Sequence, residues 1–276
     1  MEHTDYAKLW REAMERKTNI GNPYKDNPEC AVNYDRSEKI WSDGAERAQG
    51  LPFGPADTVL DIGSGPGVLA VPLAGKVRAV TAVEPSDTML NLMHRHCVRE
   101  NIHNIRTVCG NWEDVSVSGF PEHDYVIASY SLNMPDILPA LAAMDKAARK
   151  KVYLYWFCGL ASWEKLLVDL YPAVHGYEFH AQPKSDVLYG VLSQMGISAD
   201  VEDLEDTSFD RGFADMDSAV GDLRRRLRLT DRKHDDVLAD YIRQNYIATG
   251  DGWVFRDETH YVCISWTPAL AKEECA

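Results

Sequence analysis

The chain has 276 residues, of which 45% are hydrophobic and 26% are charged, and its formal net charge is −14. This length suits one large α/β domain with an elaboration, or two small domains, and the acidic balance disfavours DNA, RNA and anionic lipid as partners. No apolar run reaches the roughly 18 to 20 residues that a membrane span needs, and the charged N-terminus lacks the apolar core of a signal peptide. We therefore expect a cytoplasmic protein.

The first 160 residues show the clearest periodic patterns. Residues 1–50 are polar and helical in pattern, which predicts an N-terminal helical arm. Residues 51–160 predict a core in which strands alternate with helices, and this alternation implies right-handed βαβ units and a parallel sheet. Its strands are predicted over 58–62, 77–83, 105–109, 124–129 and 151–157. Its helices are predicted over 67–74, 86–99 and 137–148, and we expect Pro72 to kink the first of them.

The alternation loosens beyond residue 160. Helices are predicted over 163–171 and 186–195 and twice within 209–250, and strands over 198–204 and 260–266. We expect 161–276 to supply helical cap insertions and the last two strands of the core sheet. These two strands should lie side by side at one edge, with the helices forming a cap over the C-terminal ends of the parallel strands.

A glycine-rich loop follows the first predicted strand, where residues 61–67 read Asp-Ile-Gly-Ser-Gly-Pro-Gly. Three glycines let the backbone turn sharply and come close to a ligand at the head of a helix. Dinucleotide sites favour the spacing G-x-G-x-x-G, because a pyrophosphate lies on the helix N-terminus. Here the spacing is G-x-G-x-G, and Val68 stands where the dinucleotide pattern has its last glycine.

Two carboxylates beside this loop favour a cationic ligand. Asp61 precedes the loop and would repel a pyrophosphate, whereas it would attract the ammonium and sulfonium of S-adenosylmethionine. Glu84 ends the second predicted strand about 20 residues further on, where a carboxylate can accept hydrogen bonds from both ribose hydroxyls. The pattern therefore predicts S-adenosylmethionine as the cofactor.

The segments 59–68 and 83–90 resemble class I S-adenosylmethionine-dependent methyltransferases, and among these the small-molecule group that includes the quinone-biosynthesis C-methyltransferases. The resemblance covers residues 30–160 well and the rest only as a topology. With the order of predicted elements, it implies an α/β fold: a Rossmann-like, doubly wound, mostly parallel seven-stranded sheet with an antiparallel last strand and a helical cap.

The resemblance also implies a cofactor site. Three sources are open for the adenine contact, namely Asn111, Glu113 and the backbone of Trp112, and Met89 matches either an adenine-packing position or a core methionine. Tyr34 belongs to a Tyr-Asp pair like one that closes over the cofactor in related enzymes. The expected cofactor-binding residues are Asp61, Gly63, Ser64, Gly65, Gly67, Glu84, Pro85, Ser86, Met89, Asn111, Trp112, Glu113, Ser129 and Tyr34.

The acceptor site is less well defined, because a sulfonium is already an activated methyl donor and no catalytic triad is required. Tyr130 and His180 are the candidate catalytic groups, although a packing or surface role is at least as good an interpretation of each. The Asn/Asp-Pro-Pro-aromatic signature of amide-N nucleic-acid methylases is replaced here by Ser-Tyr-Ser-Leu over 129–132. The expected substrate-binding residues are Tyr130, Asn133, Trp156, Tyr177 and His180.

The expected function is S-adenosylmethionine-dependent, in-line methyl transfer to a small or medium-sized molecule, with no nucleic acid and no membrane span and with a homodimer left open. The alternatives are transfer of another group from the same cofactor, a non-catalytic cofactor-binding protein, and a nicotinamide-dependent oxidoreductase. The six scattered cysteines have no zinc spacing, so we expect reduced, mostly buried thiols and no metal site, although Cys158 is placed as a metalloid methyltransferase would need. The basic run 224–228 predicts either the solvated face of a helix or a clamp for an acidic partner.

Overall fold

The computed structural model describes residues 4–19, 21, 27–117, 119–204 and 209–268. Its main sheet has seven strands in the order β3-β2-β1-β4-β5-β10-β6. The strands are β1 (Thr58–Ile62), β2 (Ala79–Glu84), β3 (Ile105–Cys109), β4 (His123–Ser129), β5 (Ala148–Cys158), β6 (Asp200–Leu204) and β10 (His260–Trp266). The first five pair in parallel, and β10 is antiparallel to both β5 and β6. The predicted fold class is therefore confirmed, including the adjacent last two strands at one edge.

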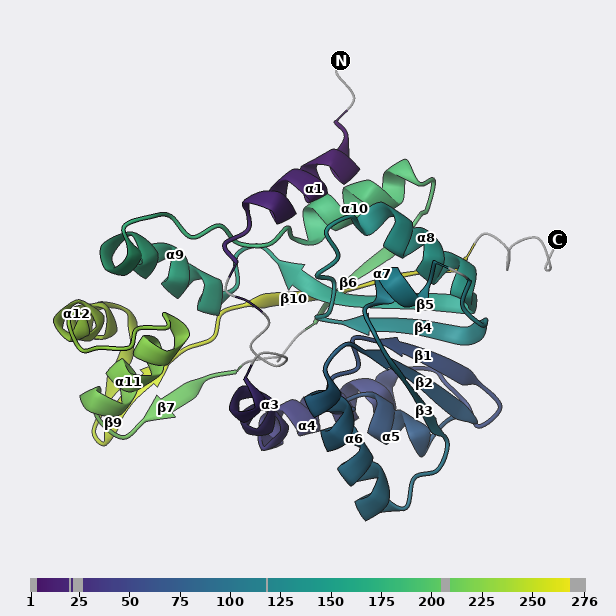
Figure 1. The fold of residues 1–276 in the computed structure, drawn as a ribbon, viewed down its shortest axis with the longest axis horizontal. Helices are drawn as coiled ribbons and strands as arrows, with labels where there is room; N and C mark the ends of the chain where they lie inside the picture. The colour runs from purple at the N-terminus through teal and green to yellow at the C-terminus, as the bar shows by residue number, and fades with distance from the viewer. Residues whose placement is uncertain (1–3, 20, 22–26, 118, 205–208, 269–276) are drawn as a thin grey trace.

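Helices cover both faces of this sheet (Figure 1). One face carries α1 (Tyr6–Arg16), α7 (Trp112–Val115), α8 (Ile137–Ala147) and α10 (Ser185–Gln194). The other carries α3 (Pro28–Asp35), α4 (Glu38–Gly50), α5 (Ala70–Ala74) and α6 (Asp87–Glu100). Each face has its own apolar core, as expected for a doubly wound sheet. The stretch predicted as one N-terminal arm is thus divided, since α1 lies on one face and α3 and α4 lie on the other.

Local sequence signals explain where the core helices begin and end. The Ser86 side chain accepts a hydrogen bond from the Met89 amide at 3.3 Å and caps α6, which ends at Asn101 in the left-handed region. The helix predicted over 67–74 begins only at Ala70, so Pro72 lies in its first turn, where a helix needs no amide donor. The helix therefore accommodates Pro72 without the kink that the sequence predicted.

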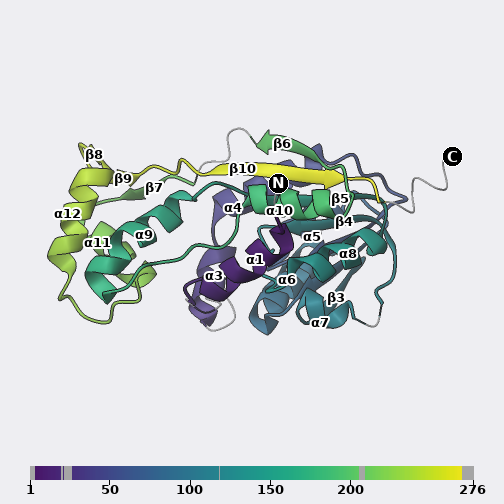
Figure 2. The ribbon, with the colours of Figure 1, turned by 90° about the horizontal axis from the view of Figure 1, so that it is seen from above.

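Residues beyond β5 form a lobe with its own apolar core. The lobe contains α9 (Ser162–His175), β7 (Arg211–Phe213), α11 (Met216–Arg226), α12 (Asp235–Asn245), β8 (Ile247–Thr249) and β9 (Gly252–Phe255). The prediction of two helices within 209–250 is correct, but it missed a small antiparallel sheet in the order β7-β9-β8. Strands of three or four residues are too short for a period of two to stand out. Figures 1 and 2 show this lobe extending past the carboxyl end of β5.

The basic run 224–228 is a structural element of the lobe. Arg224 donates two hydrogen bonds to Asp235, at 3.0 and 2.9 Å, and so joins α11 to α12. Arg225 and Arg226 pair with Asp222 at 3.1 and 2.8 Å. The solvated-face interpretation fits Arg225, whose side chain is 74% exposed, whereas Arg224 and Arg226 are partly buried and are held by carboxylates of the same lobe.

Five cysteines lie in the described residues, whereas Cys275 lies outside them. None of the five forms a disulfide within the described residues, but only Cys263 is buried, and Cys109 and Cys158 are exposed. The expectation of mostly buried thiols is therefore wrong, because both exposed cysteines end their strands. Among the described residues, no three His, Cys, Asp or Glu side chains gather as metal ligands, and no helix has the length and apolar character to cross a bilayer.

Candidate cofactor site

The glycine loop after β1 adopts a backbone that only glycine allows easily. Gly63, Gly65 and Gly67 have φ angles of 69°, 56° and 93°. A Cβ atom on Gly63 would lie 2.2 Å from Cβ of Ser131, and one on Gly67 would lie 2.9 Å from Cγ of Met93. A Cβ on Gly65 would meet no atom within 4 Å. The loop is therefore packed against the protein at both ends and faces open space at its centre, where a ligand can approach the backbone.

Asp61 is a buried carboxylate with one oxygen that lacks a partner. It is the last but one residue of β1, it is 2% exposed, and its Oδ2 atom has no hydrogen bond among the described residues. Burial first, and then the nearby Glu84 carboxylate, raise the pKa of Asp61 to about 7 against the opposing effects of Arg47 and of a hydrogen bond from the Ala70 amide. A buried carboxylate oxygen without a partner is costly, so this position is suited to a ligand that brings a positive charge.

This pKa predicts a pH-dependent affinity for a cationic ligand. A bound cation stabilises the ionised carboxylate, so affinity should rise with pH until Asp61 is ionised in the free protein, and it should level off above about pH 7. Calorimetric titration with S-adenosylmethionine between pH 5.5 and 8 measures this profile. An affinity that falls over this range would contradict the prediction.

Glu84 lies beside Asp61 at the end of β2 and is tied to the loop. Its Oε2 atom accepts a hydrogen bond from the Gly65 amide at 3.0 Å, and its Oε1 atom accepts one from the Ser86 amide at 2.9 Å. Burial raises the pKa of Glu84 despite these two bonds. Each carboxylate oxygen keeps lone-pair capacity for a further donor, as ribose hydroxyls require. Pro85, between the two bonded positions, is half-buried.

The residues expected around adenine come from three elements. Met89 of α6 is buried in a small apolar cluster against which Tyr34 of α3 packs. The structure therefore brings these two predicted residues together. Asn111 directly precedes α7 as its N-cap residue, and its side-chain amide donates to Asp114 at 2.9 Å. The Trp112 indole is buried and donates to the Ala140 carbonyl at 3.1 Å, so this side chain is a core residue and does not contact a ligand.

Tyr130, directly after β4, has the features of a functional residue. It is a non-glycine residue at φ 55°, a strained conformation that clusters at active sites. Its ring lies 5.3 Å from those of Phe157 and Tyr261, and its hydroxyl is buried without a hydrogen bond of normal geometry among the described residues. Burial raises the pKa of Tyr130 to about 12, so the phenol stays protonated and can donate a hydrogen bond but is not suited to act as a base.

The other predicted acceptor residues are not brought to this site. Trp156 is fully buried, its indole donates to the Pro183 carbonyl at 3.0 Å, and it packs against Trp10. It is therefore a core residue, because β5 is covered on both faces and both edges. The sequence pattern showed Trp156 at the end of a strand but could not show which face it occupies.

Tyr177, His180 and Asn133 lie on the surface. Tyr177 is 55% exposed, and His180 is exposed beside the end of α1, where its backbone exchanges hydrogen bonds with Thr18. The exposed Asn133 side chain accepts a hydrogen bond from Lys17 at 3.0 Å. The structure therefore gives His180 no buried partner for work as a base.

Two charged residues of α4 reach the site, and the sequence analysis missed both. The Arg47 guanidinium lies over the Tyr130 ring, 5.1 Å from its centroid, and 3.4 Å from Oγ of Ser129. Asp43, one turn earlier, is 7% exposed, and its Oδ2 atom has no hydrogen bond in the described part of the chain. A signal was present, because Asp43 and Arg47 are spaced four residues apart on a helix, and Gly44 lies between them.

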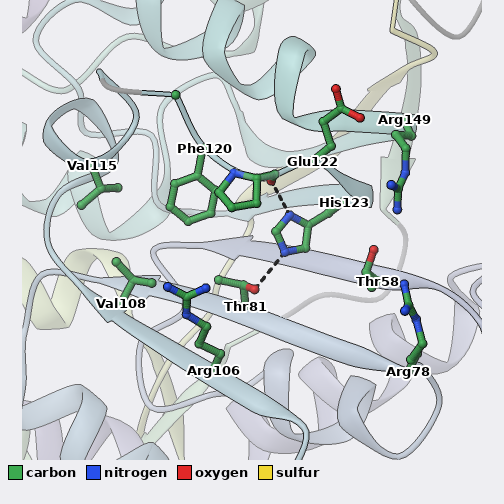
Figure 3. Close-up of a pocket in the computed structure, with 12 residues that line it drawn as sticks. Thr58, Arg78, Thr81, Arg106, Val108, Val115, Phe120, Glu122, His123 and Arg149 are labelled. Carbon is green, nitrogen blue, oxygen red and sulfur yellow. Dashed lines mark hydrogen bonds between the residues drawn. The ribbon is translucent and has the colours of Figure 1, made fainter.

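A separate hollow of about 410 Å³ lies at the opposite ends of the strands (Figure 3). His123 in its wall has Nδ1 2.8 Å from the Pro121 carbonyl and Nε2 2.8 Å from the Thr81 hydroxyl. A carbonyl only accepts, so Nδ1 carries the proton, and burial lowers the pKa of His123 and favours this neutral form. Because His123 begins β4 whereas Ser129 ends it, this hollow is not the cofactor site.

Comparison with known proteins decides the family. Residues 59–151 match the family described as "Methyltransferase domain". This chain contains a class I methyltransferase domain. The predicted family is confirmed, and with it S-adenosylmethionine as the cofactor, whereas the quinone-biosynthesis group remains a prediction. The match covers β1 to β4 and the beginning of β5, so the methyltransferase domain holds the glycine loop, Glu84 and Tyr130.

Individual proteins resemble this chain in fold or in part of its sequence. The YcgJ protein of Bacillus subtilis is 13% identical and superimposes with a TM-score of 0.56 over 84% of this chain and 98% of its own. A protein from Bacillus halodurans C-125 described as a candidate methyltransferase is 16% identical, with a TM-score of 0.57 over 82% of this chain and 99% of its own. Both likenesses show the fold. An uncharacterized protein of Haemophilus influenzae is 34% identical over 102 residues, and the match spans 36% of each chain.

The residues of the methyltransferase domain fit its cofactor. The buried Oδ2 atom of Asp61 and Oγ atom of Ser64 lack partners in the described structure, and the space over Gly65 is open. A ligand with a cation and several hydrogen-bonding groups would satisfy these atoms.

Proposed function

We propose that this protein transfers the methyl group of S-adenosylmethionine to a small or medium-sized acceptor. The observation that carries the proposal is the buried Asp61 carboxylate beside Glu84, with its Oδ2 atom unpartnered among the described residues, at a loop whose centre faces open space. We also propose that residues 51–160 form the cofactor-binding core, that 161–276 supply the cap and the last strands, and that the protein works in the cytoplasm.

In this proposal, the residues of this chain bind and orient the cofactor. When bound, the cofactor supplies a methyl group that its sulfonium already activates. Asp61 holds the ammonium, Glu84 accepts from the ribose hydroxyls, and Met89 packs on the adenine face together with Tyr34. The adenine amino group is bound by Asn111, by Glu113 or by the Trp112 backbone. No residue is required as a base unless the acceptor must lose a proton.

The acceptor is expected to have an apolar or cationic body. The segment after β4 presents Tyr130 against Phe157 and Tyr261, and aromatic faces suit both kinds of group. The acidic chain repels polyanions, so nucleic acid is not the proposed substrate. Tyr130 remains protonated and can donate a hydrogen bond to an acceptor oxygen or nitrogen.

Calorimetry with three ligands tests this function. We expect S-adenosylmethionine and S-adenosylhomocysteine to bind with a stoichiometry of about one, and NAD not to bind, because a pyrophosphate would face Asp61 and Glu84. Transfer of a labelled methyl group to a panel of small aromatic and amine compounds then tests catalysis. Binding of NAD in preference to S-adenosylhomocysteine would overturn the proposal, and cofactor binding without transfer to any acceptor would favour the non-catalytic alternative.

A further inference from the structure

The hollow at the amino ends of the strands is basic, although the chain is acidic. Its lining contains three arginines, Arg78, Arg106 and Arg149, and one carboxylate, Glu122. The whole chain has 43 acidic residues against 29 lysines and arginines, so the charge balance of this hollow is the reverse of the average. Cations gathered around a hollow of about 410 Å³ raise the local concentration of small anions.

These three arginines are only partly paired with protein groups. Arg106 forms no hydrogen bond or ion pair with another residue that the structure describes. Arg78 donates from Nε to the Ala56 carbonyl at 3.2 Å. Arg149 has one long ion-pair contact of 3.4 Å, with Asp124. A guanidinium has five N–H donors, so most donors of the three side chains can bind an anion.

The cationic groups reach the hollow from both sides. Arg106 of β3 pairs in register with Thr81 of β2, so the two side chains share one face of the sheet. Figure 3 shows Arg106 on one side of His123 and the two other arginines, Arg78 and Arg149, on the other side. Burial first, and then the charges of Arg149 and Arg106, lower the pKa of His123. Both guanidinium groups therefore lie near the imidazole ring, at the middle of the hollow.

The wall beside Arg106 is apolar. It consists of Val108, Val115 and the half-buried Phe120. The Phe120 ring packs edge-on against the buried Trp112 indole, with ring centroids 5.4 Å apart, and this contact holds it in place. A fixed aromatic surface next to a guanidinium is suited to a ligand that joins a flat or apolar body to an anionic group.

We propose that this hollow binds a small organic phosphate, with the phosphoryl group on Arg106 and the apolar body on Phe120. The planar guanidinium fork matches two phosphate oxygens, and Arg78 and Arg149 add to the positive field. The site lies at the opposite ends of the strands from Asp61 and Glu84, so the inference is independent of the proposed function.

Calorimetry at pH 8 with phenyl phosphate, inorganic phosphate and phenol tests this site. Both phosphates are mainly dianions at this pH, because their second ionisation has a pKa of about 6 to 7. We expect phenyl phosphate to bind about 10-fold more tightly than inorganic phosphate, and phenol not to bind. Arg106→Gln should weaken phenyl phosphate about 10- to 100-fold, the range for hydrogen bonds to charged groups. Arg95→Gln, which changes an exposed arginine of α6, is the matched control and should leave the affinity unchanged.

A second variant tests the apolar wall separately from the charge. Phe120→Leu should still bind inorganic phosphate but should reduce the preference for phenyl phosphate to within about threefold. Both Arg106→Gln and Phe120→Leu should bind S-adenosylhomocysteine as the wild type does. Absence of phenyl phosphate binding at millimolar concentrations, or equal affinities in Arg106→Gln and Arg95→Gln, would overturn the site. Equal wild-type affinities for the two phosphates would overturn the assignment of an organic ligand.

Discussion

Asp61→Asn is expected to weaken binding of S-adenosylmethionine at pH 8 by about 30- to 4000-fold, because the loss of one member of a buried charge pair costs about 2 to 5 kcal/mol. The variant keeps the shape of the side chain, so the fold should be retained. Calorimetric titration measures the affinity. Glu122→Gln removes an exposed carboxylate at the opposite end of the sheet and should leave the affinity unchanged.

The same substitution should make the free protein more stable. The pKa of Asp61 in the folded chain is about 7, above its ordinary value of 3.8, so the folded state binds the proton more tightly than the unfolded state. The stability that this proton contributes is lost as the pH rises from about 4 to 7, and at pH 8 the ionised carboxylate costs on the order of a few kcal/mol. Thermal unfolding at pH 8 should therefore show a higher Tm for Asp61→Asn than for the wild type. Unchanged affinity together with a lower Tm would mean that Asp61 is a structural residue.

Glu164→Ala is expected to have the largest effect on stability, with a loss of about 3 to 5 kcal/mol. Glu164 is 1% exposed, and its carboxylate accepts from the Lys184 ammonium at 2.6 Å and from the Ala161 amide at 3.0 Å. Burial lowers the pKa of Lys184 even beside this carboxylate. The truncation would therefore leave a buried cation unpaired and remove the hydrogen bond that begins α9.

Denaturant unfolding followed by circular dichroism measures this loss. Lys165→Ala is the matched control, because the neighbouring Lys165 is 60% exposed and its surface ion pair with Asp169 is worth at most about 1 kcal/mol. Equal midpoints for the two variants would contradict the assigned role of the Glu164–Lys184 pair.

The elements that could be predicted from the sequence are those whose signal is local. The glycine loop, Asp61 and Glu84 follow from the residues at the ends of two strands, because parallel strands bring their carboxyl ends to one edge. The Ser86 cap and the apolar face of α6 are likewise contained within one turn or one helix. The missed strands β7, β8 and β9 are three or four residues long and owe their pairing to the lobe that surrounds them.

Residues that depend on packing between distant segments could not be predicted. Arg47 reaches the site only because Gly44 lets α4 rest on Val68, and nothing in the order of residues shows that approach. Trp156 is an aromatic residue of a kind that often lines ligand sites, but at its position in β5 the side chain packs in the core against Trp10. The exposed positions of Tyr177 and His180 are set by how the lobe and α1 meet the sheet, which no local pattern specifies.

Proton release on cofactor binding tests the central claim most directly. At pH 6 most Asp61 carboxyls in the free protein are protonated, and a bound ammonium would expel that proton. Calorimetric titration of S-adenosylmethionine at pH 6, in two buffers with different ionisation enthalpies, counts the protons released. Release approaching one proton per cofactor in the wild type, and none in Asp61→Asn, is the predicted result. Binding without proton release, or equal release by the two proteins, would contradict the claim that a buried Asp61 carboxylate binds the positive charge of the cofactor.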